Sequence, residues 1–274
     1  MNPMKIASLI CLPLVVVGVG AACAHGDVLY QSQGNSNNEF TSYDGLGCTV
    51  QTADPFLVNG VSQGSYLDAF YYPMALLNTP ADASLLGNQE LWVGFLMRRD
   101  ANNAWAGGVF LSSATTLDGA RYGPGYAGAI GWHKQNASIT LISADYARNA
   151  SFSLTPVPEQ QVAVMARFYE TEGSGTFNTA DLYVDGNLAD GIDFGSPLGT
   201  GFDIGSGAQS TIKNLRLGAN VGEVRSYDNL IVASSQGEAY AAMGAVPEPS
   251  QYAMMAGLGL VGFGVWRRKT KSSK

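Results

Sequence analysis

Few residues in this chain have the types and spacing that catalysis requires. Gly60 to Gly64 fit the pattern G-x-S-x-G, which in hydrolases places a nucleophilic serine on a tight strand-to-helix turn. The next residues, Ser65 to Asp68, favour a strand, and the chain has only two histidines, His25 and His133, that could act as a base. The pattern therefore indicates a glycine-rich loop and not a nucleophile.

Acidic pairs are the second chemistry to consider, because glycoside hydrolysis needs two carboxylates on either side of the scissile bond. Asp181 and Asp185 share one face of a predicted strand, but Asp185 falls in a turn and neither has an acidic partner that would raise its pKa. From Glu223 to Asp228 the acids are interrupted by Arg225, and the stretch has no second glutamate. The sequence therefore predicts structural roles for these acids.

Aromatic side chains are candidates for binding rather than catalysis. Tyr126 lies in a glycine-rich stretch and Trp132 follows it, so their flat faces could stack on sugar rings. Trp92 and Trp105 fall on predicted strands, where core packing is the expected role. The glycan-stacking candidates are therefore Trp132 and Tyr126.

Strands must position these residues, because residues 25–245 contain no long helical pattern. The predicted strands cover Leu91 to Arg98, Trp105 to Leu111, Ala137 to Ile142, Val162 to Tyr169, Ala180 to Val184, Ile212 to Leu217 and Ser226 to Val232. The first is apolar on both faces, as in a central strand, and we expect the second to be its antiparallel partner. Asp185-Gly186-Asn187 predicts a hairpin turn, and a short helix is predicted near Gly237 to Met243. The pattern favours an all-β fold, an antiparallel β-sandwich of roughly a dozen strands.

The later half of this pattern resembles the concanavalin-A-like and laminin-G-like jelly rolls. The similar residues are the strand pair from Val162 to Gly186 with its LYVDG hairpin, the stretch Asn214 to Gly218, and the strand Tyr227 to Val232, which reads YDNLIV. The resemblance covers about 140 residues from Leu91 onward. It implies a jelly-roll β-sandwich.

The same resemblance bears on activity and cofactors. Laminarinase-like enzymes of this fold carry the pattern E-x-D-x-(x)-E on one strand face, and no stretch of this chain matches it. Laminin-G-like sandwiches often hold calcium at a loop rim, and here Asp100, Asn102 and Asn103 supply the hard oxygen ligands that calcium prefers. The expectation is a protein that is not an enzyme, with calcium as the candidate cofactor.

The N-terminus has the three parts of a secretory signal. Lys5 stands near the start, an apolar run extends from Ile6 to Gly20, and the small residues Ala22 and Ala24 follow. The run is 15 residues long, whereas about 20 are needed to span a membrane. We therefore expect residues 1–24 to direct the chain to the export machinery and signal peptidase to cut after Ala24.

The C-terminus also has three parts. The first part, residues 246–250, reads VPEPS and includes Val246, Pro247, Glu248 and Pro249. The second part, residues 252–266, carries no charge. The third part, residues 267–271, is a basic tail that begins Arg267, Arg268, Lys269. At 1.5 Å per residue the uncharged stretch covers about 22 Å as a helix, short of the roughly 30 Å hydrocarbon core. The basic tail keeps the C-terminus cytoplasmic, so the residues between the two ends lie outside the inner membrane.

This tail closely resembles the PEP-CTERM sorting signal of Gram-negative bacteria, with Pro247, Glu248 and Pro249 on the signature positions. The resemblance implies that an exosortase, a membrane-embedded cysteine transpeptidase, cuts near the motif and passes the protein to the cell surface or the extracellular matrix. The helix would lie in the inner membrane only before processing. A plain C-terminal anchor with an incidental Pro-Glu-Pro is the alternative.

Cysteine usage agrees with export. Cys11 and Cys23 lie in the predicted signal, so Cys48 remains alone and no internal disulfide can form. A buried structural cysteine is the favoured role for Cys48, and an intermolecular bridge or a reactive thiol is the alternative. Lipidation of Cys23 is disfavoured, because Gly20 stands where an aliphatic residue is usual.

Charge excludes a nucleic-acid partner. The whole chain carries −7, and residues 25–245 carry nine basic and 21 acidic residues, a net charge near −12 without the basic surface that binds phosphates. The sequence therefore predicts one exported β-sandwich domain, residues 25–245, followed by a sorting signal at 246–271. The expected function is structural or adhesive, in exopolysaccharide or biofilm. A carbohydrate-binding or lectin-like module is the alternative, and a glycoside hydrolase is less favoured.

Overall fold

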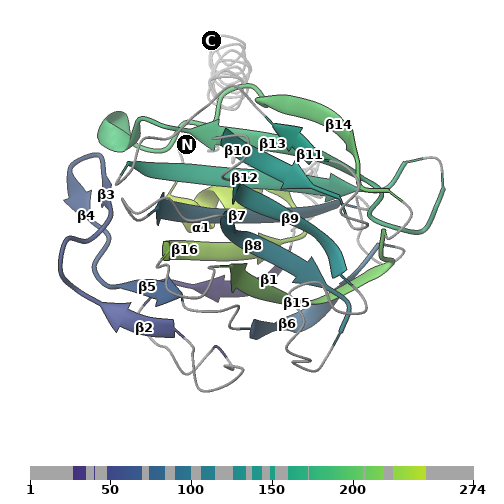
Figure 1. The fold of residues 1–274 in the computed structure, drawn as a ribbon, viewed down its shortest axis with the longest axis horizontal. Helices are drawn as coiled ribbons and strands as arrows, with labels where there is room; N and C mark the ends of the chain where they lie inside the picture. The colour runs from purple at the N-terminus through teal and green to yellow at the C-terminus, as the bar shows by residue number, and fades with distance from the viewer. Residues whose placement is uncertain are drawn as a thin grey trace, which may run out of the picture.

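The chain folds into two antiparallel β-sheets packed face to face (Figure 1). The computed structural model describes residues 27–34, 40, 48–69, 74–83, 90–99, 106–114, 126–133, 138–143, 149–151, 160–171, 173–205, 208–218 and 225–244. Every strand pair in these ranges is antiparallel. The predicted all-β antiparallel sandwich is therefore confirmed.

The larger sheet has eight strands and the smaller has six. In order, the larger contains β14 (Gly199–Asp203), β13 (Thr179–Asp185), β12 (Gln161–Tyr169), β7 (Glu90–Arg99), β16 (Arg225–Ala233), β5 (Tyr66–Ala69) and β2 (Cys48–Gln51), with β1 (Val28–Ser32) also paired to β16. The smaller contains β11 (Asn149–Ser151), β10 (Ser138–Ile142), β9 (Tyr126–His133), β8 (Ala106–Ser112), β15 (Thr211–Gly218) and β6 (Met74–Asp82).

In the described ranges three short elements lie outside the two sheets. They are the hairpin of β3 (Leu57–Val58) and β4 (Val61–Ser62), the 3₁₀ turn η2 (Leu188–Asp190) and the helix α1 (Gln236–Met243). The helix predicted near residues 237–243 is thus confirmed. It contacts β16, β7 and β1.

Two apolar clusters hold the fold together. The main core fills the space between the sheets, and its members include Leu91, Phe95, Leu111, Ile130, Ile139, Leu215 and Tyr227. The outer cluster lies on the opposite face of the larger sheet; its members include Phe56, Trp92, Leu96, Met165, Tyr183, Leu188, Phe194, Tyr240 and Met243. The middle of the larger sheet is therefore buried on both faces.

β7 illustrates how the sequence pattern produces this arrangement. Val93 and Phe95 enter the main core, whereas Trp92 and Leu96 enter the outer cluster. The strand lies between β12 and β16. The expected central strand, apolar on both faces, is confirmed, and so is the expected burial of Trp92.

One predicted pairing is wrong. The expected hairpin between residues 91–98 and 105–111 does not form, because β8 lies between β9 and β15 in the smaller sheet. Gly108 allows β8 to lie close to β9, since a Cβ on residue 108 would overlap the carbonyl oxygen of Ile130 in β9. A polar turn between two apolar runs has the same pattern whether it joins neighbours in one sheet or crosses between sheets.

The chain reverses after Asp185, as predicted, and β14 pairs with β13, but the connection is longer than the tight hairpin turn predicted at Asp185-Gly186-Asn187. The Asp185 carboxylate accepts hydrogen bonds from the backbone N–H groups of Asn187 and Asp193, at 2.8 and 2.9 Å. The chain then forms η2 and buries Phe194 in the outer cluster before β14 pairs with β13. The connection between β13 and β14 is long because it contains apolar residues, such as Phe194, whose burial against the larger sheet is favourable.

Candidate functional site

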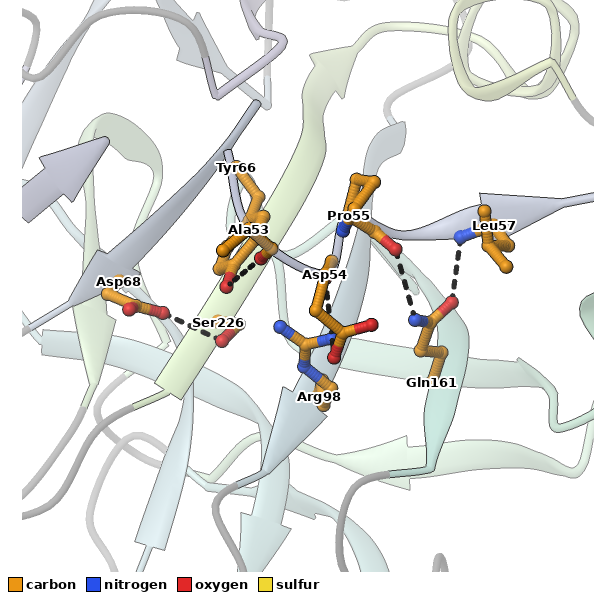
Figure 2. A network of polar contacts seen from close by, with 9 residues as sticks. All are labelled: Ala53, Asp54, Pro55, Leu57, Tyr66, Asp68, Arg98, Gln161 and Ser226. Carbon is orange, nitrogen blue, oxygen red and sulfur yellow. Dashed lines mark hydrogen bonds and ion pairs between the residues drawn. The ribbon is translucent and has the colours of Figure 1, made fainter. Parts of the chain in front are cut away.

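A row of four polar residues crosses the larger sheet at one end of β7 and β12. Asp68, Ser226, Arg98 and Gln161 come from four adjacent strands and are consecutive register partners. Ser226 Oγ donates a hydrogen bond to Asp68 Oδ1 at 2.7 Å. Figure 2 shows the row together with Asp54, Pro55 and Leu57, to which Arg98 and Gln161 hydrogen-bond. The row thus holds a segment that lies off the sheet.

Arg98 makes most of the contacts to that segment. Its Nη1 donates to the backbone oxygen and to the carboxylate of Asp54, each at 2.8 Å (Figure 2). Its guanidinium lies 5.4 Å from the ring centre of Phe56 and 4.9 Å from that of Tyr66. The Arg98 side chain is 7% exposed, whereas that of Asp54 is 84% exposed. Solvent therefore screens the ion pair, and the stacking and the backbone bond hold the segment.

Gln161 fixes the start of the β3–β4 hairpin. Its Oε1 accepts from the backbone N–H of Leu57 at 2.8 Å, and its Nε2 donates to the carbonyl of Pro55 at 3.4 Å (Figure 2). At the hairpin turn, the N–H of Asn59 donates to the carbonyl of Leu188 in η2 at 2.7 Å. The hairpin is therefore tied to the sheet at its base and to η2 at its tip.

A groove of about 470 Å³ opens between the hairpin and η2. Its lining residues are Leu57, Gly60, Gln161, Leu188 and Ala189, and we call it the hairpin groove. Leu57 is 48% exposed and Val61, farther along the hairpin, is 62% exposed. An open, mainly apolar groove with exposed aliphatic side chains can hold a ligand by contact, but it presents no nucleophile.

An acidic hollow of about 380 Å³ adjoins the other side of η2. It is lined by Asp185, Asn187, Asp190, Gly191 and Asp193. Asp185 accepts the two backbone hydrogen bonds described above, whereas the side chains of Asp190 and Asp193 are exposed. Within the described ranges, no three His, Cys, Asp or Glu residues are arranged to hold a metal ion. The hollow can accept hydrogen bonds from hydroxyl or amino groups.

A second charged cluster lies at the opposite end of β7 and β12. Arg167 Nε lies 2.6 Å from Glu90 Oε2, and its Nη1 lies 3.5 Å from Asp181 Oδ2. Tyr169 OH and the backbone N–H of Gly201 both donate to Asp181 Oδ1, at 3.3 and 2.8 Å. The cluster thus places two carboxylates around one guanidinium.

Electrostatics set the chemistry of this cluster. Burial lowers the pKa of Arg167, but the adjacent carboxylates, Glu90 first and then Asp181, raise it above its ordinary value. Burial and the Asp181 charge raise the pKa of Tyr169. The three charged groups therefore form one ion-pair network. Asp181 and Asp185 each accept hydrogen bonds from backbone N–H groups that follow them in the chain.

Two further groups were candidates for chemistry. Ser62, in the G-x-S-x-G pattern, lies in β4, and its Oγ accepts from the backbone N–H of Gly64 at 3.2 Å. A strand, β5, follows the pattern, as expected for a loop without a nucleophile. Cys48 is buried, and burial, with Asp68 adding to it, raises its pKa to about 12. The predicted burial of Cys48 is thus confirmed, and a protonated thiol is a poor nucleophile.

The other predicted site residues are placed only in part. Tyr126 and Trp132 are the first and the seventh residue of β9; the backbone of Tyr126 pairs with Ser112, and that of Trp132 with Gly107 and Ile139. The calcium candidates Asp100, Asn102 and Asn103 lie outside the described residues, as do Ala22, Ala24, residues 246–250 and residues 267–271. The stacking and calcium sites stay predictions.

Sequence reasoning missed the hairpin groove and the polar row. Arg98 ends an apolar strand and Gln161 begins one, so each looked like an ordinary strand boundary. One feature of the sequence could have indicated the groove: Leu57 and Val61 are apolar residues on either side of Gly60, in a tight turn. In the structure both side chains are exposed. The pattern alone does not bring residues 57 and 161 together, because that contact depends on a connection folding back over the sheet.

The C-terminal segment identifies how the protein is handled. A comparison with protein families matches residues 245–269 to the PEP-CTERM protein-sorting motif. The chain carries a PEP-CTERM sorting signal. The sequence prediction of this signal is thereby confirmed, and the PEP-CTERM motif marks an exported protein that is sorted through its C-terminus. Among the described residues no helix is long and apolar enough to cross a membrane, and the predicted span at 252–266 lies outside them.

Several solved structures are similar to the sandwich that precedes the PEP-CTERM signal. The T. cruzi calreticulin globular domain is 10% identical, with a TM-score of 0.48 over 80% of this chain and 96% of that one. Arcelin-5, a lectin-like defence protein from Phaseolus vulgaris, is 11% identical, with a TM-score of 0.41 over 71% and 89%. Basic winged bean lectin is 11% identical, with a TM-score of 0.41 over 75% and 95%. A comparison with curated protein sequences found no match.

Proposed function

We propose that the protein crosses the inner membrane, is held there briefly by residues 252–266, and is passed by an exosortase to the cell surface or the extracellular matrix. There the sandwich serves as a structural or adhesive component of exopolysaccharide or biofilm. The PEP-CTERM motif at residues 245–269 is the observation that carries this proposal. Pro247 and Pro249 support it physically, because prolines deny the segment helical hydrogen bonds and leave it extended for an enzyme to bind.

Intact-mass analysis of the protein from its own host tests the sorting step. The expected species begins at His25 and ends near Pro247. A variant with Pro247→Ala and Pro249→Ala should keep residues up to Lys274 and remain in the inner membrane, whereas Pro80→Ala, an exposed proline of β6, should be processed normally. A wild-type protein that retains Lys274 would show that the tail is a permanent anchor.

The proposed role is not enzymatic. The support comes from the described carboxylates: Glu90 and Asp181 both form ion pairs with the Arg167 guanidinium, so both are engaged in one ion-pair network. Incubation with a panel of polysaccharides should release no reducing sugar. Hydrolysis that disappears in Glu90→Gln would overturn this part of the proposal.

Glycan binding is the second candidate function. The observation in its favour is the hairpin groove beside the acidic hollow, where aliphatic contact and exposed Asp190 and Asp193 carboxylates flank the same turn, η2. Sugar rings offer C–H faces to apolar side chains and hydroxyl groups to carboxylates, so the two surfaces together match a glycan. The stacking surface predicted from Trp132 and Tyr126 is the competing location.

Retention on immobilised polysaccharides separates these locations. At the groove, Leu57→Gln should weaken retention about tenfold, and Asp190→Asn should also weaken it. Leu76→Gln is the matched control, because Leu76 is 52% exposed, close to the 48% of Leu57, and lies in β6 of the smaller sheet, outside the hairpin groove. Loss on Trp132→Ala or Tyr126→Ala instead would place the site on β9. Equal retention of all variants would remove glycan binding at both surfaces.

A further inference from the structure

The last helix and the sorting signal are adjacent in the chain. α1 ends at Met243, and Gly244 caps it in the left-handed conformation, with φ 69°. The PEP-CTERM match begins at Ala245, and only Ala245 and Val246 separate the cap from Pro247. The folded domain therefore ends at the edge of the segment that the sorting enzyme must bind.

Three buried side chains hold α1 on the outer face of the larger sheet: Ala239, Tyr240 and Met243. The Tyr240 ring centre lies 6.4 Å from that of Trp92 and 5.4 Å from that of Phe194. These aromatic contacts join the helix to β7 and to the connection after η2. Docking of α1 thus depends on tertiary contacts with elements distant in sequence.

Gly94 leaves a space on the outer face of the larger sheet that the Met243 side chain occupies, and we call this space the Met243 seat. A Cβ on Gly94, in the middle of β7, would overlap the Met243 sulfur. Glycine weakens a strand interior and commonly marks a place where another group approaches closely. Here that group belongs to α1. Gly94 and Met243 are complementary, so the docked position of the helix is specific.

α1 forms only while it is docked. It has eight residues, including Gly237, whereas an isolated helix needs about 12–15 residues to be even marginally stable. Undocking therefore releases the whole segment. The release stops at Ser234, because its N–H donates to the carbonyl of Asp27 at 3.0 Å and its Oγ accepts from the N–H of Asp27 at 2.7 Å. Residues 235–243 would therefore have two states, a docked helix and an undocked, unfolded segment.

We propose that docked α1 restricts access of the exosortase to its motif, so that processing proceeds from the undocked state. The proposal rests on the sorting function proposed above. With α1 docked, two residues give at most about 7 Å of extended chain before Pro247; with α1 undocked, residues 235–246 give about 40 Å. Cleavage needs an accessible, extended segment, so its rate follows the population of the open state.

Variants at the seat test the proposal in the native host, where the ratio of precursor to processed chain is followed by pulse-chase and intact mass. Met243→Ala removes the side chain in the seat, and Gly94→Ala fills the seat. Each should speed processing about tenfold. Gly237→Ala should slow processing about twofold, because alanine stabilises the helix and Gly237 has open space around it. Hydrogen exchange at residues 236–243 reports the undocking directly.

Two controls separate access from general instability. Ile130→Val destabilises the main core without touching α1 and should leave the rate unchanged. An insertion of ten Gly and Ser residues between Gly244 and Ala245 supplies reach while α1 stays docked; it should speed processing, and Met243→Ala should then add nothing.

Unchanged or slower processing in both Met243→Ala and the insertion variant, with the wild type cut normally, would overturn the access proposal and leave the sorting function intact. If the wild type itself is never cut, and Pro247→Ala behaves like it, the sorting function fails instead. The two failures are therefore distinguishable.

Discussion

Asp228 provides the most quantitative test of the structure. It lies in β16, opposite Leu96, with no exposed surface. Its Oδ1 accepts from the N–H of Asn229 at 2.8 Å, and among the described residues its buried Oδ2 has no hydrogen-bond partner. Burial raises its pKa to about 7, and the Asn229 hydrogen bond only partly offsets the effect. A carboxylate in this position loses its hydration, and no described cation compensates for that loss.

The sign of the pH dependence follows from the raised pKa. Between pH 4 and pH 7 the folded protein holds a proton on Asp228 that the unfolded chain has released, so stability falls as pH rises through this window. The difference between a folded pKa of about 7 and an unfolded value of about 3.9 corresponds to roughly 4 kcal/mol above pH 7. Between pH 5 and pH 8.5 the loss is roughly 2–3 kcal/mol.

Asp228→Asn isolates this contribution. The amide keeps an oxygen that accepts from the Asn229 N–H, and it does not ionise. Urea unfolding at pH 5 and pH 8.5, followed by tryptophan fluorescence, gives the free energy of unfolding of both proteins. The advantage of the variant over the wild type should grow by roughly 2–3 kcal/mol between the two pH values. A difference between the proteins that does not change with pH would refute the reasoning, because it would mean that Asp228 stays ionised in the folded state.

Three further predictions concern packing. Arg98→Met should lower the free energy of unfolding by about 1–3 kcal/mol and speed hydrogen exchange at residues 53–57. Asp54→Asn should lower it by less than about 1 kcal/mol, because the Asp54 side chain is 84% exposed. Equal effects of the two variants would contradict the stacking role of Arg98. Because burial raises the pKa of Cys48 to about 12, the native protein should not react with a thiol reagent at pH 8 and should react fully in urea; rapid native reaction would show an open site. Gly108→Ala should cost about 1–3 kcal/mol in urea unfolding, because the new Cβ would overlap a backbone carbonyl. Its control, Gly237→Ala, has open space and should raise stability by up to about 1 kcal/mol; similar losses in both would refute the packing argument.

Strand positions were predictable from the sequence because burial has a simple local signature. The face formed by Val162, Val164, Ala166 and Phe168 enters the main core, as the alternation predicts. Pairing was less predictable. The turn residues before β8 favoured a hairpin with β7, but β8 lies in the other sheet, since the same turn residues serve a hairpin and a crossing between sheets.

The candidate site was largely invisible in the sequence. The hairpin groove joins residues 57–60, 161 and 188–189, which no local pattern relates. Arg98 ends an apolar strand like any solvated arginine, yet its side chain is 7% exposed and stacks on two rings. The Met243 side chain occupies the space beside Gly94, and nothing in the local sequence of that strand indicates it. Each role depends on a partner that is distant in the chain.

The sequence by itself determined the sorting signal, the all-β class and the strands with one or two apolar faces. These properties are local: a short motif is read as a linear segment, and strand alternation has a period of two. Only the tertiary structure decided which strands pair, where residues 52–65 lie, that Asp228 is buried, and that α1 docks on the larger sheet. Those outcomes arise from contacts between residues far apart in sequence, and their free energies depend on which surfaces meet and not on the order of residues along the chain.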